Sequence, residues 1–125
     1  RTAYENSLKL VEGLIALDPD SIAYQRDMMV NYNRLGNLAL NQGDKAGALA
    51  AYEKSLKLVE AIAARDPESM IYQCDLVVGY AQMAQVTDEK VWWRKALKIV
   101  EKMAKDGTLA SSDQPWLADL RKQSR

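Results

Sequence analysis

The sequence predicts an all-α protein built of antiparallel helix pairs, and three observations support this fold class. A long segment returns, little changed, 48 residues further along the chain. Apolar residues recur at spacings of three and four, as in amphipathic helices, and no segment shows the two-residue period of a strand. Proline or glycine beside an acidic residue marks the expected helix boundaries at regular intervals.

The repeat is clearest when residues 3–32 are aligned with residues 51–80. The two segments are identical at 18 of 30 positions, which indicates an internal duplication. A third, degraded copy follows, in which residues 96–101 match residues 55–60 at an offset of 41. Such repeats bury their apolar faces by stacking on their neighbours. The sequence therefore predicts an α-solenoid.

The boundaries of the helices follow from capping residues. Asp18–Pro19 and Asp66–Pro67 each predict a cap followed by a proline in the first helical turn. Gly43–Asp44 predicts the end of one helix and the cap of the next. The result is about five long helices and a short C-terminal helix, at about residues 3–17, 19–41, 45–65, 67–86, 88–106 and 115–123.

The composition excludes much of the chemistry that enzymes use. Lysine and arginine number 17, as do aspartate and glutamate, so the balanced charge disfavours nucleic acid and anionic membranes as partners. No histidine is present for acid–base catalysis or metal binding. The single cysteine, Cys74, excludes an internal disulfide and a thiolate zinc site. We expect no enzyme activity, no catalytic residue, no metal and no cofactor.

Residues 1–125 are expected to form one domain. The chain starts at Arg1 within a helical pattern, so we expect a piece of a longer protein. It contains no signal-peptide pattern and no apolar run near the roughly 20 residues needed to span a bilayer. The default expectation is a cytoplasmic protein.

The second helix pair carries a recognisable motif. Leu35–Gly36 is followed by Gly43–Asp44 and then by Ala48, Tyr52 and Ser55–Leu56. This order closely resembles the tetratricopeptide repeat, which has Leu-Gly in its first helix, a Gly-Asp turn, and a small, an aromatic and a small residue in its second helix. The resemblance implies a right-handed superhelix. The family period is about 34 residues and the period here is 48, so the resemblance implies a bacterial type with long helices. It also implies a protein-interaction module.

The resemblance places a peptide-binding stripe on the first helix of each pair, which lines the concave side of the superhelix. Asparagines at spacings of four share one helix face, and their amides can pair with a peptide backbone. The alternative is that these are ordinary solvated side chains. We call this set the predicted groove face: Val30, Asn33, Arg34, Asn37 and Asn41 on one helix, and Val78, Gln82 and Gln85 on the next.

Some members of the family grip a C-terminal carboxylate with a lysine and an asparagine. Asn37 matches that asparagine, but Asn33 stands where the lysine is expected. The resemblance therefore does not favour a carboxylate clamp.

Two further sets of residues are considered as a partner contact and as a metal site. Adjacent residues on a helix point about 100° apart, so at most one of Trp92 and Trp93 faces the core. Trp92 is therefore a candidate partner contact, since tryptophan is enriched at binding hot spots. The acidic residues Asp27, Asp75 and Asp119 recur one repeat apart, too far to share an ion. We expect them to interact with helix dipoles instead.

The runner-up function is structural. The helix at residues 3–17 lacks the first helix of its pair, so part of its apolar stripe is expected to be exposed. The chain would then be a spacer or oligomerisation segment of a larger multidomain protein, with self-association through this helix. In either case the expected partner is a protein or peptide, with no nucleic acid and no membrane.

Overall fold

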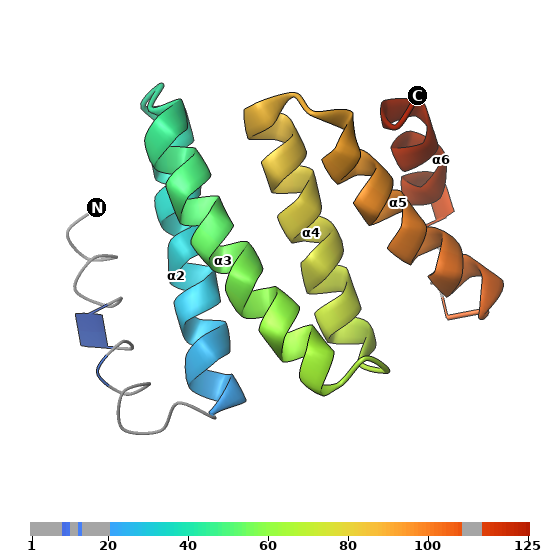
Figure 1. Ribbon diagram of the computed structural model, residues 1–125, viewed down its shortest axis with the longest axis horizontal. Coiled ribbons are helices and arrows are strands. Elements are labelled where there is room, and N and C mark those ends of the chain that lie inside the picture. The colour runs from blue at the N-terminus through green and yellow to red at the C-terminus, as the bar shows by residue number, and fades with distance from the viewer. Residues whose placement is uncertain (1–8, 11–12, 14–20, 109–113) are drawn as a thin grey trace. The chain divides into compact units, whose positions relative to one another are not determined.

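The computed structural model describes residues 9–10, 13, 21–108 and 114–125 (Figure 1). The helix predicted at residues 3–17 lies outside them, apart from residues 9, 10 and 13, which are helical. The described chain has no strand, which confirms the all-α fold class, and the superhelical stacking of the pairs stays a prediction. Its five labelled helices are α2 (Ile22–Asn41), α3 (Lys45–Arg65), α4 (Met70–Thr87), α5 (Lys90–Lys105) and α6 (Gln114–Gln123).

The chain divides into two compact units. Unit 1 comprises residues 1–66 and contains α2 and α3, which pack against each other as a pair. Unit 2 comprises residues 67–125 and contains α4, α5 and α6, in which α5 contacts both other helices.

A tight turn joins α2 to α3. Gly43 has φ +77, a conformation that suits glycine, and its N–H donates to Leu40 O at 3.0 Å. The N–H of Asp44 donates to Ala39 O at 2.8 Å, which completes a Schellman motif at the end of α2. The Asp44 carboxylate then accepts from the N–H of Gly47 at 2.9 Å, so the same residue caps the start of α3. The Gly-Asp pair therefore ends one helix and begins the next.

Serine side chains cap α2 and α4. Ser21 accepts from the N–H of Tyr24, and Ser69 from the N–H of Tyr72, at 3.3 and 3.4 Å. The helices therefore begin three residues beyond the predicted starts at 19 and 67. Pro67 lies in the turn that precedes the cap. The serines occupy equivalent positions of the repeat, so the duplication preserved the cap.

The turn between α4 and α5 differs from the Gly-Asp turn. Thr87 is the last residue of α4, Asp88 has φ 59 in the left-handed region, and Glu89 is the N-cap without a side-chain hydrogen bond. Thr87 instead uses its hydroxyl to accept from the N–H of Glu89 at 3.2 Å and to donate to Met83 O at 2.8 Å.

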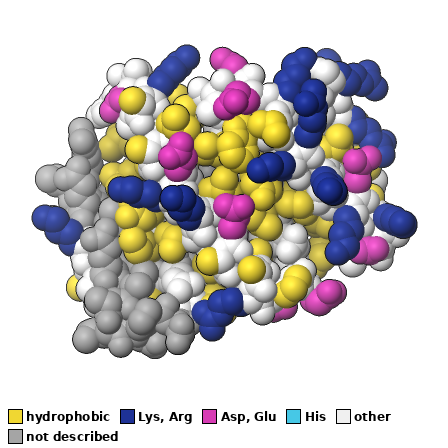
Figure 2. Space-filling model, in the orientation of Figure 1, with side chains coloured by type: hydrophobic (Ala, Val, Ile, Leu, Met, Phe, Trp, Pro, Cys, Tyr) yellow, Lys and Arg dark blue, Asp and Glu magenta, His cyan; other side chains and the backbone are white. Residues whose placement is uncertain are grey.

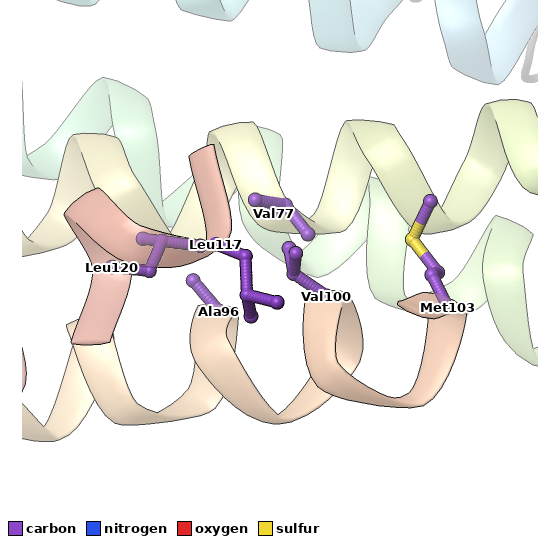
Figure 3. Packing of buried hydrophobic residues seen from close by; sticks show 6 residues of the cluster. All are labelled: Val77, Ala96, Val100, Met103, Leu117 and Leu120. Carbon is purple, nitrogen blue, oxygen red and sulfur yellow. The ribbon is translucent and has the colours of Figure 1, made fainter. Parts of the chain in front are cut away.

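The core of unit 2 lies where its three helices meet (Figure 3). Two more contacts hold α6 by its C-terminal end: Lys90 and Arg94 of α5 donate to the carbonyl oxygens of Arg125 and Ser124. Cations at a helix C-terminus also interact favourably with the helix dipole. The buried cluster comprises Val77, Ala96, Val100, Met103, Leu117 and Leu120.

No helix in the described part of the chain is both long enough and apolar enough to cross a membrane.

Candidate functional site

The centre of unit 1 is a close contact between an aromatic ring and a glycine. The Tyr52 ring of α3 lies directly over Gly36 of α2, and only 3% of Tyr52 is exposed. A Cβ at Gly36 would lie 2.6 Å from Tyr52 Cδ1, closer than side-chain atoms approach one another. Any side chain at position 36 would displace the Tyr52 ring, so this packing requires glycine there. Burial raises the pKa of the Tyr52 hydroxyl above 10.0.

Two hydrogen bonds between α2 and α3 flank this contact. The hydroxyl of Tyr52 donates to Asn37 Oδ1 at 2.5 Å. The hydroxyl of Ser55, which is buried, donates to Asn33 Oδ1 at 2.6 Å and also lies 3.3 Å from Met29 O. Each asparagine thus supplies an acceptor that satisfies a hydroxyl of a residue buried between the helices. Two residues of the predicted groove face therefore also hold the helix pair together.

The α2 part of the predicted groove face follows one side of the helix. Asn37, Arg34 and Asn41 are exposed, while Asn33 and Val30 are half-buried. Because the oxygens of Asn33 and Asn37 accept from α3, the groups that each offers for a peptide are the two amide hydrogens. This side of α2 is therefore suited to binding peptide carbonyl groups.

The α4 part of the predicted groove face is more apolar than its amides suggest. Val78 is 44% exposed, Gln85 is exposed, and Gln82 is half-buried with its Oε1 lacking a hydrogen-bond partner among the described residues. Ile71, which sequence reasoning missed, is 62% exposed and lies seven residues before Val78, on the same helix face. The spacing of seven between Ile71 and Val78 was the signal that could have found it.

The two adjacent tryptophans have different surroundings. Trp93 packs against the buried cluster of unit 2. Trp92 is half-buried, and its ring stacks on Tyr80 with centroids 6.2 Å apart and planes inclined by 24°. Its Nε1 is buried without a hydrogen-bond partner in the described part of the chain. Its role as a partner contact stays a prediction.

A lysine lies over a tyrosine ring at equivalent places in the two units. Lys54 Nζ lies 5.5 Å from the centroid of Tyr32, and Lys95 Nζ lies 5.8 Å from that of Tyr80. The tyrosines are 48 residues apart and the lysines 41, the same two offsets that align the sequence. The two helix pairs are thus duplicated in their side-chain packing as well as in their sequence.

The described residues contain no group of three or more cysteine or acidic side chains placed to hold a metal ion. Asp27, Asp75 and Asp119 therefore belong to no such group.

The comparisons with known proteins bear on the α2–α3 pair. The family model of the tetratricopeptide repeat matches residues 31–62, and this segment is a tetratricopeptide repeat. The match contains Gly36, the Gly43–Asp44 turn and Tyr52, whose contacts are described above. Tetratricopeptide repeats generally mediate protein–protein interactions and are not a catalytic family. No curated protein and no solved structure matches the chain.

Proposed function

We propose that the chain is a protein-interaction module that binds an extended peptide or protein segment along the predicted groove face. The observation that carries this proposal is the tetratricopeptide repeat at residues 31–62, which contains Asn33, Arg34, Asn37 and Asn41. On α2 the peptide meets amide hydrogens and one cation, and these groups suit backbone carbonyls.

The exposed apolar side chains of α4 support the same function. Ile71 and Val78 share a face with Gln82 and Gln85, so this face of α4 offers exposed apolar side chains to a partner. We infer that this helix contributes apolar contacts and that α2 contributes hydrogen bonds.

A peptide array tests this proposal. The chain is compared with the double variant Arg34→Ala/Asn41→Ala and with Ile71→Ser/Val78→Ser. These side chains are exposed or nearly so, and the helices are expected to form in all three proteins, which circular dichroism checks. Peptides that bind the parent chain and are lost in both variants support the predicted groove face. Peptides retained by both variants contradict it.

Asn33 and Asn37 need a matched control because each also joins α2 to α3. Asn37→Ala removes the side chain from the surface and breaks its bond to Tyr52. Tyr52→Phe breaks the same bond from the opposite helix and leaves the surface amide in place. If Asn37→Ala loses peptide binding and Tyr52→Phe retains it, the amide contacts the peptide. Equal losses mean that its role is to hold the helices. Ser55→Ala is the corresponding control for Asn33, because it removes the hydroxyl that donates to Asn33 Oδ1 and leaves the asparagine in place.

A structural spacer or oligomerisation segment is the second candidate function. The observation that favours it is Leu10, which is 68% exposed in the N-terminal region that the sequence predicts to self-associate. Leu8→Asp tests it, with Leu10→Asp as a second substitution. Light scattering that shows an oligomer for the parent chain and a monomer for either variant supports this function. A monomer in all cases rules out self-association through this segment.

A further inference from the structure

Unit 2 contains an open groove that the predicted groove face does not include. Its volume is about 450 Å³, and it lies between α4 and α5. None of Ile71, Val78, Gln82 and Gln85 lines it. A volume of this size accommodates one or two large side chains of a ligand.

The floor of the groove is apolar. Met70 and Tyr80 of α4 face Ile99 and Met103 of α5, and these four residues belong to the core of unit 2 or pack against it. Methionine side chains are flexible and adjust to the shape of an inserted apolar group. The floor is thus suited to a bulky apolar side chain.

Three lysines of α5 line the same groove: Lys95, Lys98 and Lys102. Their spacings of three and four place them on one helix face, where like charges repel. Figure 2 shows lysine and arginine side chains gathered over α5 and α6. Of the seven charged residues in α5, only Glu101 is acidic, and α4 contains no lysine or arginine. The balanced charge of the whole chain therefore conceals a basic helix.

Lys98 and Lys102 differ from Lys90 and Arg94 in their partners. Lys90 and Arg94 bind carbonyl oxygens at the C-terminus of α6, as described above. Lys98 and Lys102 form no ion pair with any described residue, and Glu101 pairs with Arg121 of α6 at 3.6 Å. Lys95 lies 4.7 Å from the centroid of the Trp92 ring. The groove thus offers cationic groups without a carboxylate partner in the described chain.

We propose that this groove, here called the lysine groove, binds an acidic amphipathic segment of a partner protein. One bulky apolar side chain of the segment enters the cavity above Met70 and Ile99, and its flanking carboxylates pair with Lys98 and Lys102. Glu68 and Asp106 also line the groove, at the end where α4 begins and α5 ends. Their negative charges disfavour carboxylates of the segment beyond Lys102, which orients the segment.

The composition of the lysine groove favours a peptide over other anionic ligands. Nucleic acid is held through phosphates along an extended cationic surface, whereas here two carboxylates interrupt the rim and the floor is apolar. In its described residues, unit 1 differs from this arrangement. Its cavity of about 260 Å³ lies at the α2–α3 turn, and only two lysines, Lys54 and Lys57, occupy the positions equivalent to Lys95 and Lys98. The site is therefore a property of unit 2.

Fluorescence polarisation with a defined probe tests the proposal. The probe is a labelled 12-residue peptide with one central leucine pair flanked by glutamates, and its controls replace either the glutamates by glutamine or the leucines by serine. The parent chain is expected to bind the probe at least about tenfold more tightly than either control, with an affinity that falls as salt rises. Equal affinity for the probe and a control overturns the proposal, as does the absence of binding.

Charge reversal locates the site. Lys98→Glu/Lys102→Glu is expected to weaken probe binding at least about tenfold, because two attractive charges become repulsive. Lys57→Glu, a single reversal at the exposed position of unit 1 that is equivalent to Lys98, is expected to leave probe binding unchanged. Unchanged binding in the unit 2 variant, or equal losses in both, overturns the lysine groove. Tighter binding of a polyanion without apolar groups, such as heparin, than of the probe overturns the choice of ligand.

This experiment is independent of the proposed function. Arg34→Ala/Asn41→Ala and Ile71→Ser/Val78→Ser alter the predicted groove face and are expected to leave probe binding intact. Loss of the probe in those variants would contradict a separate second site.

Discussion

The two units of the chain derive from one duplicated helix pair, yet they hold their helices together differently. In unit 1 a tyrosine ring rests on a glycine, and two hydrogen bonds between side chains flank that contact. In unit 2 all five of these residues have changed: Ala81, Ala84 and Gln85 replace Asn33, Gly36 and Asn37, and Trp93 and Ala96 replace Tyr52 and Ser55.

The replacements are consistent with one another. An alanine that fills the space over a former glycine excludes a ring in the old position, and Trp93 packs against the core of unit 2 instead. Ala96 is fully buried and needs no hydrogen-bond partner, so the asparagine that would satisfy a serine is no longer required. The difference shows that the helix pair tolerates either a polar or an apolar interface, provided that the partners change together.

The distribution of tryptophans makes this comparison measurable. All three lie in unit 2, so tryptophan fluorescence follows the unfolding of that unit, whereas circular dichroism follows the helices of both. In helical repeats stability is approximately a sum of local terms and nearest-neighbour terms. Each prediction below is measured by chemical denaturation with both signals.

The largest effect is expected from Tyr52→Ala. It removes a ring that is 97% buried and leaves a cavity over Gly36, which costs roughly 3–5 kcal/mol of unfolding free energy. Trp93→Ala is the equivalent change in unit 2. It is expected to cost less, because Trp93 is only half-buried. The circular-dichroism transition should shift more than the tryptophan transition in Tyr52→Ala. A loss below about 0.5 kcal/mol would contradict the packing described for unit 1.

Gly36→Ala is expected to come next. The added methyl group meets the Tyr52 ring, and overpacking of this kind costs about 1–3 kcal/mol, partly offset by the better helix propensity of alanine. Ala84→Gly is the mirror change in unit 2, where helix propensity alone predicts a loss of about 1 kcal/mol. Stabilisation of unit 1 by Gly36→Ala would contradict the close contact between the Tyr52 ring and Gly36.

Substitution of the capping residues is expected to change stability less, and by different amounts in the two units. Asp44→Ala removes the carboxylate that caps α3 and should cost about 1 kcal/mol. Glu89→Ala should cost little, because Glu89 makes no side-chain capping bond. Glu89→Ser introduces a capping hydroxyl and should stabilise α5. Equal losses for Asp44→Ala and Glu89→Ala would refute this difference between the turns.

The smallest effect is a dependence on pH above the neutral range. The pKa of Tyr52 is raised by burial, so its contribution to stability is fully present below pH 10.0 and is lost as pH rises through the folded-state pKa. Tyr52→Phe should abolish this part of the alkaline destabilisation and cost about 0.5–1.5 kcal/mol at neutral pH through the lost bond to Asn37. An unchanged alkaline profile in the variant would contradict the assignment to Tyr52.

Most of the helices could be predicted from the sequence because their signals are local. The predicted helix at residues 45–65 has the observed bounds of α3, since Gly43 and Asp44 each act on the nearest backbone groups. The starts of α2 and α4 were misplaced by three residues. Asp-Pro and Ser compete as caps within the same turn, and the serine hydroxyls made the hydrogen bonds.

The predicted groove face was placed by the family resemblance together with helical spacing. Spacing is reliable for deciding which residues share a side of α2 or α4. Spacing does not report what a side chain contacts on another helix. The use of Asn33 and Asn37 as acceptors for Ser55 and Tyr52 therefore escaped prediction. The lysine groove escaped it for the same reason, and because the net charge of the whole chain is an average over helices of unequal charge.

The sequence by itself determined the helical class, the duplication and the Gly-Asp turn, because periodicity and capping depend on residues within a few positions of one another. The tertiary structure alone decided which polar side chains stay available to a partner and which satisfy a neighbouring helix. It also decided where lysines of α5 and apolar side chains of α4 enclose a common space. Those properties arise from pairs of residues 15 or more positions apart, whose proximity is set by the packing of whole helices.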